Sequence, residues 1–204
     1  EEDNIAETLK GLKREIKLKF QVIIVYDYDQ DPTLRIIRDE INNSNIILLK
    51  NKYKSFNGAV KTAFEYSNAE AVVLYTAEDH QNFNVVNKMF TKFTEGYDVV
   101  CASRLTAGGD YHLANEPLIK QTLVKIVSNT LIKLTKVGTS DPTNGFRLFS
   151  NKIIKNIPIK SKYGFTFAIE LLAKAYSLGH KICEVPSKSP IRKKGVSKFK
   201  YSSD

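Results

Sequence analysis

The hydrophobic pattern alternates between two periods along the first half of the chain. Short runs rich in Val, Ile and Leu end abruptly in polar residues, as strands buried on both faces do. Between these runs, apolar residues recur every three or four positions, which favours amphipathic helices. The pattern predicts strands at 20–26, 45–50, 69–76 and 97–103, and helices at 5–16, 32–41, 56–68 and 83–96.

The second half of the chain carries a different order of elements. The pattern predicts a long amphipathic helix at 117–136, a loop at 138–145, a short strand at 146–150, a helix at 164–178 and a strand at 181–186. The 204 residues contain no internal repeat and no Pro/Gly/Ser-rich linker, so we expect one domain.

Strands that alternate with helices predict an α/β fold with a mostly parallel sheet and right-handed crossovers. In such sheets, ligands bind beyond the carboxyl ends of the strands. Three polar segments follow predicted strands in this chain, at 27–31, 76–80 and 103–110. We therefore expect these three segments to share one rim of the sheet.

Composition narrows the class of protein. A hydrophobic content of 42%, with 11 Phe and 10 Tyr, is enough for a proper core. Cys101 and Cys183 lie far apart in apolar runs, so a disulfide framework is not expected and a reducing compartment fits best. No apolar run approaches the roughly 18 residues of a membrane span, and no signal peptide opens the chain.

The chain begins Glu1-Glu2-Asp3-Asn4, without Met, where the composition suits a helix entry. We therefore expect the sequence to be a piece of a longer protein. A net charge of +9 is concentrated at the other end, where residues 187–204 carry six Lys or Arg and one Asp. Such a basic tail suits the phosphates of a nucleotide, a lipid headgroup or a nucleic acid, or is simply a solvated terminus.

Acids gather at two strand ends. Glu78, Asp79 and His80 follow the third predicted strand, where carboxylates suit Mg²⁺ and a histidine suits Mn²⁺. Such a cluster alone is more often an ordinary polar strand end. Asp27 and Asp29 follow the first predicted strand and could accept hydrogen bonds from a ribose or a base, whereas Asp31 before Pro32 suits a helix cap.

Three further segments carry cationic side chains. Arg104 follows a strand and could grip a phosphate with its forked donors, or be an ordinary surface residue before Gly108-Gly109. The turn "DPTNGFR" contains Arg147, and "RKKGVSK" offers Arg192 and Lys198 around one glycine. The sequence has no P-loop, no G-x-G-x-x-G, no zinc-type cysteine spacing and no G-x-S-x-G.

Taken in order, these segments resemble the family-2 glycosyltransferases, in particular the branch of dolichyl- or polyprenyl-phosphate sugar synthases. The resemblance runs over almost the whole chain. It rests on "EEDNIAETL", "VIIVYDYDQDPT", "NKYKSFNGAVKTAF", "VVLYTAEDHQNFNVV", "YDVVCASR", "DPTNGFRLF", "GFTFAIELLAKAYSLGHKICEVP" and "RKKGVSK". Each fragment is weak, but the ordered set is specific.

The resemblance implies a GT-A fold, a Rossmann-like, mostly parallel sheet flanked by helices. It implies one domain over 1–186, with a nucleotide-sugar half at 1–103 and an acceptor half at 104–186, followed by a basic tail at 187–204. The family's opening strand lies in the centre of the sheet and is missing from this sequence. Its absence would expose the edges of neighbouring strands.

The resemblance also implies an inverting transfer of sugar from a nucleotide-diphosphate sugar to a phosphate-bearing acceptor, with Mg²⁺ or Mn²⁺ and no strong general base. The expected acceptor is a polyprenyl phosphate, with peripheral membrane contact at the cytoplasmic face and no nucleic acid. The implied roles are metal binding by Glu78, Asp79 and His80; catalysis by Glu78, Asp79, Arg104 and Arg147; and donor or acceptor contacts by Glu2, Asp27, Asp29, Lys54, Arg192 and Lys198.

The sequence departs from the family at its metal motif. The first Asp of the family's Asp-x-Asp is Thr76 here, and the second is Glu78, with Asp79 as a neighbour that could substitute. This departure keeps two alternatives open: an inactive relative that only binds a nucleotide sugar, and a nucleotidyltransferase. Nucleic-acid binding through the tail ranks last, because the aromatic residues belong to core segments.

Overall fold

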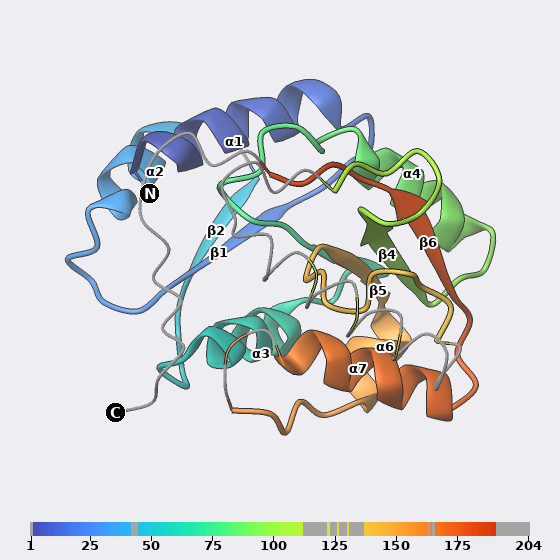
Figure 1. Ribbon diagram of the computed structural model, residues 1–204. Coiled ribbons are helices and arrows are strands. Elements are labelled where there is room, and N and C mark those ends of the chain that lie inside the picture. Colours follow the sequence, from blue (N-terminus) through green and yellow to red (C-terminus); the bar gives the residue numbers. More distant parts are fainter. Residues whose placement is uncertain are drawn as a thin grey trace.

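The computed structural model describes residues 2–41, 45–111, 137–162, 164 and 166–190, together with 122, 126 and 130 (Figure 1). Most of the helix predicted at 117–136 therefore lies outside the described residues, as do Arg192 and Lys198 of the tail. The side chain of Glu2, at the start of the first helix, is outside them as well.

The described elements follow the predicted order. They are α1 (Glu2–Glu15), β1 (Val22–Tyr26), α2 (Thr33–Ile41), β2 (Ile46–Lys50), α3 (Phe56–Tyr66), β3 (Ala71–Leu74), α4 (Val85–Thr94), β4 (Val99–Ser103), β5 (Arg147–Ser150), α6 (Asn151–Asn156), α7 (Thr166–Ser177) and β6 (Ile182–Pro186). Short α6 was not predicted, because six residues are too few to establish a helical period.

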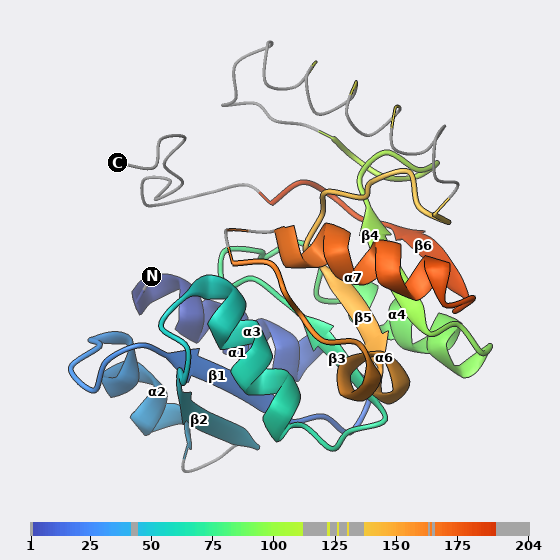
Figure 2. The same cartoon turned by 90° about the horizontal axis from the view of Figure 1, so that it is seen from below.

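The strands form two groups (Figure 2). β1 and β2 pair in parallel, with Val22 opposite Ile46 and Tyr26 opposite Lys50. A four-stranded sheet has the order β3-β5-β4-β6, in which β5 runs antiparallel to both neighbours and β4 is parallel to β6. The predicted α/β fold with a mostly parallel sheet is confirmed, with β5 as the reversed strand.

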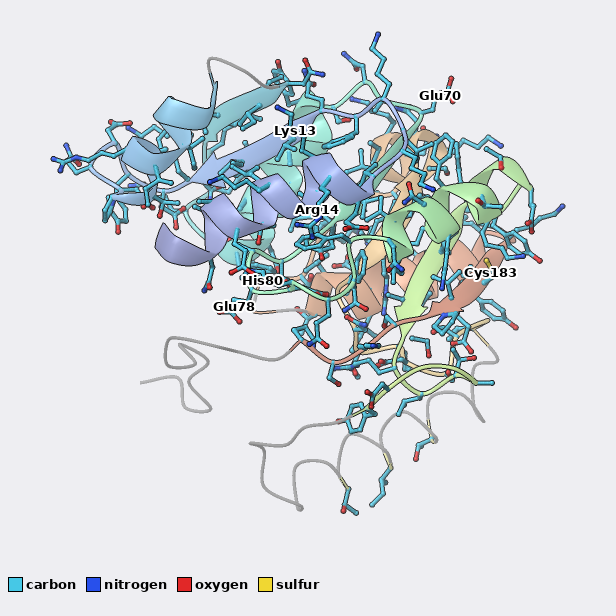
Figure 3. All side chains as sticks on the ribbon, turned by 90° about the horizontal axis from the view of Figure 1, so that it is seen from above. Lys13, Arg14, Glu70, Glu78, His80 and Cys183 are labelled. Carbon is cyan, nitrogen blue, oxygen red and sulfur yellow. The ribbon has the colours of Figure 1, made fainter. Side chains whose placement is uncertain are left out.

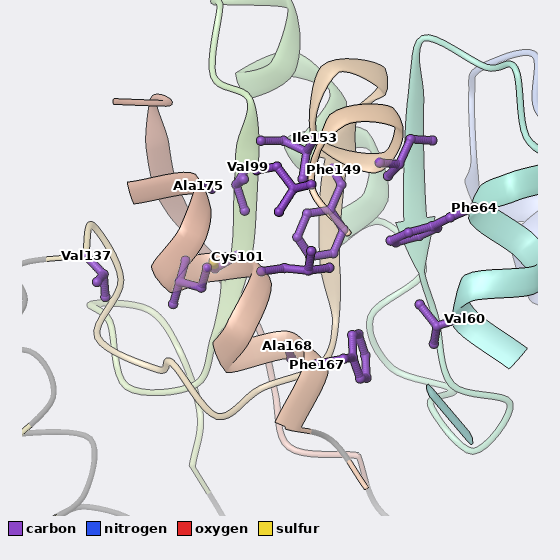
Figure 4. Close-up of a cluster of buried hydrophobic side chains, with 14 residues drawn as sticks. Val60, Phe64, Val99, Cys101, Val137, Phe149, Ile153, Phe167, Ala168 and Ala175 are labelled. Atoms are coloured by element: carbon purple, nitrogen blue, oxygen red, sulfur yellow. The ribbon is translucent and has the colours of Figure 1, made fainter. Parts of the chain in front are cut away.

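Helices cover both faces of the strands and make three layers (Figure 1). α1, α2 and α4 lie on one face, and α3, α6 and α7 lie on the other. The largest buried cluster joins α3, α6 and α7 to β4 and β5, and Figure 4 shows Phe64, Phe149 and Phe167 within it. The alternation of side chains along β4 divides the cores: Val99 and Cys101 face this cluster, whereas Val100 and Ala102 face α4.

The sheet is interrupted between its two groups. All residues of β4 and β5 are buried, but the equally apolar β1 and β3 are only half-buried. Within the described residues, each of β1 and β3 pairs with one strand.

The two cysteines and the lengths of the helices can be described within this part of the chain. Cys101 and Cys183 are both free thiols, and their strands place them in cores on opposite faces of the sheet. None of the helices described is long and apolar enough to cross a bilayer.

Candidate functional site

The carboxyl ends of β1 and β2 bring Asp27 and Asn51 together. Because Tyr26 pairs with Lys50, the next residue of each strand lies beside the other, and the Asn51 N–H donates to Tyr26 O at 2.8 Å. The Asn51 side-chain Nδ2 donates to Asp27 Oδ1 at 2.8 Å. We call these residues the Asp27–Asn51 pair.

Three further contacts fix the Asn51 amide, which is 8% exposed. Its Nδ2 also donates to Ser55 O, and its Oδ1 accepts from the Tyr53 N–H and the Thr62 hydroxyl. The amide orientation is therefore determined by its partners, and one oxygen of Asp27 is held in place. Sequence reasoning missed Asn51, although its position after β2 matches that of Asp27 after β1.

The other predicted residues near this end of the sheet have separate roles. Asp29 pairs with Lys50 at 2.5 Å on the exposed surface. Asp31 Oδ1 accepts the Thr33 N–H at 3.0 Å, as its predicted place at the helix start requires. Lys54 is exposed in the turn after β2 and has a φ of 50°.

Residues 75–83 after β3, which we call the acidic loop, place Asp79 inward. Asp79 is 3% exposed; its Oδ1 accepts the N–H groups of Gln81 and Asn82, and its Oδ2 accepts Asn82 Nδ2 at 2.7 Å. Burial raises the pKa of the Asp79 carboxyl, against the lowering effect of these donors. Both oxygens are thus used to close the turn of the loop.

His80 is directed toward α1, beside Glu78 (Figure 3). Its Nδ1 lies 3.1 Å from Glu7 Oε2, and its Nε2 lies 3.2 Å from Ala77 O. Its ring stacks on Phe83 with centroids 6.4 Å apart. The structure therefore engages both ring nitrogens of His80 with oxygen atoms of the protein.

The acidic loop does not contain a ready metal site among the described residues. Glu78 is half-buried, Thr76 is exposed and carries no carboxylate, and Asp79 faces the interior. Within this described part, no three His, Cys, Asp or Glu side chains come together as possible metal ligands. The arrangement therefore does not fit the three-residue ligand set that the resemblance implies.

Arg104 directly follows β4 and forms an ion pair with Asp141. Its Nε and Nη2 donate to the two carboxylate oxygens at 2.6 and 2.9 Å, and its backbone N–H donates to the same carboxylate. Its guanidinium also lies over the Tyr111 ring at 5.1 Å. Burial lowers the pKa of Arg104, but the hydrogen bonds and charge of Asp141 more than offset this and raise it.

Arg147 lies in the core and not at the rim. It is 0% exposed, and its guanidinium donates to Ala168 O and Pro142 O, while Nε has no hydrogen-bond partner among the described residues. These contacts fasten the "DPTNG" turn to α7. The same turn contains Asp141, which accepts hydrogen bonds from Arg104. The two arginines therefore belong to one buried network.

Glu184 of β6 completes this network and was missed by sequence reasoning. Its carboxylate accepts from the Thr139 hydroxyl and from the N–H and hydroxyl of Ser140. Burial would raise the pKa of Glu184, but these donors lower it. An acid inside a strand carries no signal in the sequence that its partners lie in a loop about 45 residues away.

The first residues of the basic tail lie against the acidic loop. Lys188 exchanges two hydrogen bonds with the Asn82 side chain, each 2.9 Å long, and Gln81 Nε2 donates to Ser189 O at 3.3 Å. On the other side, the Asp110 N–H donates to Ser187 O and its carbonyl accepts from the Ser189 N–H. Residues 187–189 therefore lie between the acidic loop and Asp110.

Comparison with known proteins supplies the family. A model of the family described as Glycosyl transferase family 2 matches residues 1–157. The dolichol-phosphate mannosyltransferase of Pyrococcus furiosus is 24% identical over 98% of this chain and 56% of its own length. The dolichyl-phosphate β-glucosyltransferase of Dictyostelium discoideum is 26% identical over 85% of this chain and 56% of its own. The chain spans just over half the length of these relatives.

Solved structures support the fold. A crystal structure of glucosyl-3-phosphoglycerate synthase from Mycobacterium tuberculosis, with Mn²⁺, UDP and glucosyl-3-phosphoglycerate, superposes with a TM-score of 0.71 at 15% identity. It covers 96% of this chain and 69% of that one. At this identity the likeness establishes the GT-A fold and no more. On the family match over 1–157, the chain belongs to glycosyl transferase family 2.

Proposed function

We propose that this protein transfers a sugar from a nucleotide-diphosphate sugar to a phosphate-bearing acceptor, with inversion at the anomeric carbon. Family membership supports sugar transfer as the reaction class. The Asp27–Asn51 pair is the observation that carries the donor assignment. It presents an exposed carboxylate, oriented by a buried amide, beyond the carboxyl ends of two parallel strands.

The Asp27–Asn51 pair can recognise a nucleoside through hydrogen-bond acceptance. Asn51 occupies Oδ1 of Asp27, which leaves the second carboxylate oxygen to accept from a base N–H or a ribose hydroxyl. A carboxylate whose orientation is fixed loses little side-chain entropy on binding. This arrangement favours a sugar nucleotide whose base or ribose places an N–H or O–H group beside the second Asp27 oxygen.

The transfer needs no strong base on the protein. An oxygen of the acceptor phosphate, which carries about −1.5 to −2 charge at pH 7, attacks the anomeric carbon. The bond from that carbon to the donor's diphosphate breaks, and the nucleoside diphosphate leaves with the electron pair. The site's task is to orient two anionic reactants and to balance their charge.

We propose that cationic side chains of the basic tail balance the charge of the donor and the acceptor. The Arg104 fork is already satisfied by Asp141, and Arg147 is buried away from the rim. Lys188 is exposed beside the acidic loop, and Arg192 follows Ser189 by three residues, which span at most about 10 Å. Lys188 and the basic residues after it can therefore reach a phosphate at the acidic loop.

A divalent ion, Mg²⁺ or Mn²⁺, would balance the negative charge of the donor's diphosphate when bound. Solved relatives contain Mn²⁺ or Mg²⁺ with UDP, but the acidic loop here does not fit a three-residue ligand set. Glu78 is the half-buried carboxylate of this loop, whereas Asp79 is buried and closes the 79–82 turn. We expect Glu78 to be this chain's contribution to any divalent ion that arrives with a diphosphate.

The acceptor we favour is a polyprenyl phosphate, reached at the cytoplasmic face of a membrane. Two relatives named for dolichol-phosphate glycosylation support this choice. The basic tail supports it too, since cations near an anionic membrane surface are attracted to it. A soluble phosphate acceptor such as phosphoglycerate, which crystal structures of another relative contain, is the direct competitor.

An inactive relative that only binds a nucleotide sugar is the second candidate. Thr76 removes one carboxylate from the family motif, and Asp79 is turned away from the position where it could replace it. This candidate predicts donor binding without donor turnover.

Donor binding is tested by calorimetric titration with UDP- and GDP-sugars, with Mn²⁺ and with EDTA. We expect micromolar binding of one donor class and at least a tenfold loss in Asp27→Asn, which replaces an acceptor oxygen with a donor NH₂ group. Asp31→Asn is the matched control, because it removes one charge from the same segment and keeps the acceptor for Thr33. Equal affinity in both variants would reject Asp27 as the nucleoside contact.

A further inference from the structure

The backbone of the acidic loop is attached to α1 at Ala77. The Thr8 hydroxyl, 3% exposed, donates to Ala77 O at 2.7 Å. His80 Nε2 approaches the same carbonyl oxygen at 3.2 Å. A carbonyl has two lone pairs and both are used here, so the peptide just before Glu78 is fixed from two directions.

The peptide after Glu78 is fixed as well. Asp79 N–H donates to Thr76 O at 3.1 Å, and the Asp79 carboxylate closes the turn onto Gln81 and Asn82. Glu78 therefore stands between two immobilised neighbours. Its backbone position depends on α1 on one side and on the 79–82 turn on the other.

Close packing supports the same attachment. An added Cβ on Gly11 of α1 would lie 2.2 Å from the Phe83 ring, so the glycine allows the helix to approach the loop. Phe83 stacks on both His80 and Tyr75, with ring centroids 6.4 and 5.7 Å away. The His80 ring is thus fixed both by polar contacts and by an aromatic stack.

We propose that His80 is a positioning residue that, with Thr8 and Glu7, sets the backbone of Glu78, and that it is not a metal ligand. A metal-binding histidine must offer a ring-nitrogen lone pair to the ion. Here Nε2 faces a carbonyl, which can only accept, and Nδ1 faces the Glu7 carboxylate. Each ring nitrogen of His80 is therefore already occupied by a protein oxygen atom in this arrangement. The inference rests on the proposed function for the role of Glu78.

A positioning role and a metal-binding role of His80 predict different effects of substituting Thr8. If His80 positions the loop, Thr8→Val should reproduce part of the His80→Ala effect, since both remove a donor to Ala77 O. The double variant should then lose less donor affinity than the sum of the single losses. If His80 binds metal, Thr8→Val should leave metal affinity unchanged and His80→Ala should weaken it.

The first measurement is backbone hydrogen exchange at Asp79, Gln81 and Asn82 in the protein alone, which needs neither donor nor metal. We expect exchange at least fivefold faster in both Thr8→Val and His80→Ala, with partial recovery in His80→Gln, whose amide can still donate to Ala77 O. Lys13→Ala is the control, because Lys13 is an exposed residue of the same helix and does not line the cavity between α1, His80 and Phe83. Unchanged exchange in both Thr8→Val and His80→Ala would overturn the proposal.

The second measurement separates this inference from the proposed function. Mn²⁺ binding to the protein alone is followed by electron paramagnetic resonance, and donor affinity by calorimetry. We expect the Mn²⁺ dissociation constant of His80→Ala to stay within twofold of wild type, and donor affinity to fall about three- to tenfold in both Thr8→Val and His80→Ala. A Mn²⁺ affinity reduced tenfold in His80→Ala alone would identify a ligand. If wild type binds no donor, the proposed function fails, and hydrogen exchange still decides whether His80 fixes the loop.

Discussion

Asp27 and Asp79 show how identical side chains after two strands differ in their capacity to accept hydrogen bonds from a ligand. Both follow an apolar strand by a few residues. Asp79 is buried and accepts three hydrogen bonds from its own turn, whereas Asp27 is exposed and accepts one from Asn51. Among the described residues, Asp27 keeps acceptor capacity that Asp79 has used, so we propose Asp27 as a ligand contact and expect Asp79 to act as a structural residue.

Asp79→Asn should lower stability without affecting metal dependence. The new NH₂ group would face Asn82 Nδ2, a donor that now lies 2.7 Å from the Asp79 oxygen. Relief of the buried charge offsets part of this loss, so we expect the free energy of unfolding to fall by about 1 kcal/mol in urea titrations. Asp29→Asn, in an exposed ion pair, should change it by less than about 0.5 kcal/mol. Intact stability combined with lost metal-dependent donor binding would instead make Asp79 a ligand.

Residue roles were predictable where a local rule applied. Asp31 before Pro32 was expected to cap a helix start, and its bond to Thr33 follows that rule. Asp27 was singled out by its place after a strand. Nothing local indicated that Asn51 would orient Asp27 or that His80 would face Glu7, because these partners are 24 and 73 positions apart.

At the scale of elements, hydrophobic period was a sufficient guide to most helices and strands. β4 is fully buried, as its apolar run predicts, whereas β5 is equally buried although it begins with Arg147 and ends with Ser150. Strand ends moved by one or two residues, in part because side chains such as Tyr75, predicted in a strand, pack onto Phe83 and Phe146 outside the sheet. The pairing of β5 between β3 and β4 has no counterpart in periodicity.

Whether Gly11→Ala raises or lowers the stability of the protein tests the contact between α1 and the acidic loop. In an unobstructed helix, Ala is more stable than Gly by about 1 kcal/mol. Here the new methyl group would overlap the Phe83 ring, and overpacking costs about 1–3 kcal/mol. We expect a lower melting temperature in calorimetry, with recovery when Phe83→Leu is added. A stabilised single variant would show that α1 and the loop are not in close contact.

Glu170→Gln tests how α7 fixes the 158–162 segment, and its effect should depend on pH. Glu170 accepts the N–H groups of Lys160 and Ser161 and pairs with Lys174. Burial would raise the pKa of Glu170, but these partners lower it from 4.5 to about 2. Because the folded pKa is depressed, the stabilisation is complete above about pH 4.5 and is lost as pH falls toward 2.

We therefore expect Glu170→Gln to lower the free energy of unfolding by about 1–2 kcal/mol at pH 7, with the difference narrowing below about pH 4.5. Urea titrations from pH 7 to pH 3 measure this difference. Glu95→Gln is the control, since Glu95 makes an exposed pair with Lys92 and should have little effect at any pH. A difference independent of pH would mean that the Glu170 charge is not what stabilises α7.

At the scale of the whole molecule, distant segments meet at the rim in a way that the sequence did not reveal. The start of the basic tail contacts the acidic loop through residues 106 positions apart, and the "DPTNG" turn reaches Arg104 from 37 positions away. The sequence predicted that the strand ends share a rim, because the fold class requires it. It could not predict that Arg104 would be satisfied by Asp141, which moves the expected phosphate contacts to the tail.

Product formation tests the central claim most directly. The protein is incubated with UDP- or GDP-sugars, Mn²⁺ and vesicles containing polyprenyl phosphate, and lipids and nucleotides are analysed by mass spectrometry. We predict a sugar phosphodiester of the lipid formed in equal amount with the nucleoside diphosphate, and at least tenfold less in Asp27→Asn than in Asp31→Asn. Tight donor binding with neither product from lipid phosphate nor product from phosphoglycerate would contradict transfer and identify an inactive, donor-binding member of the family.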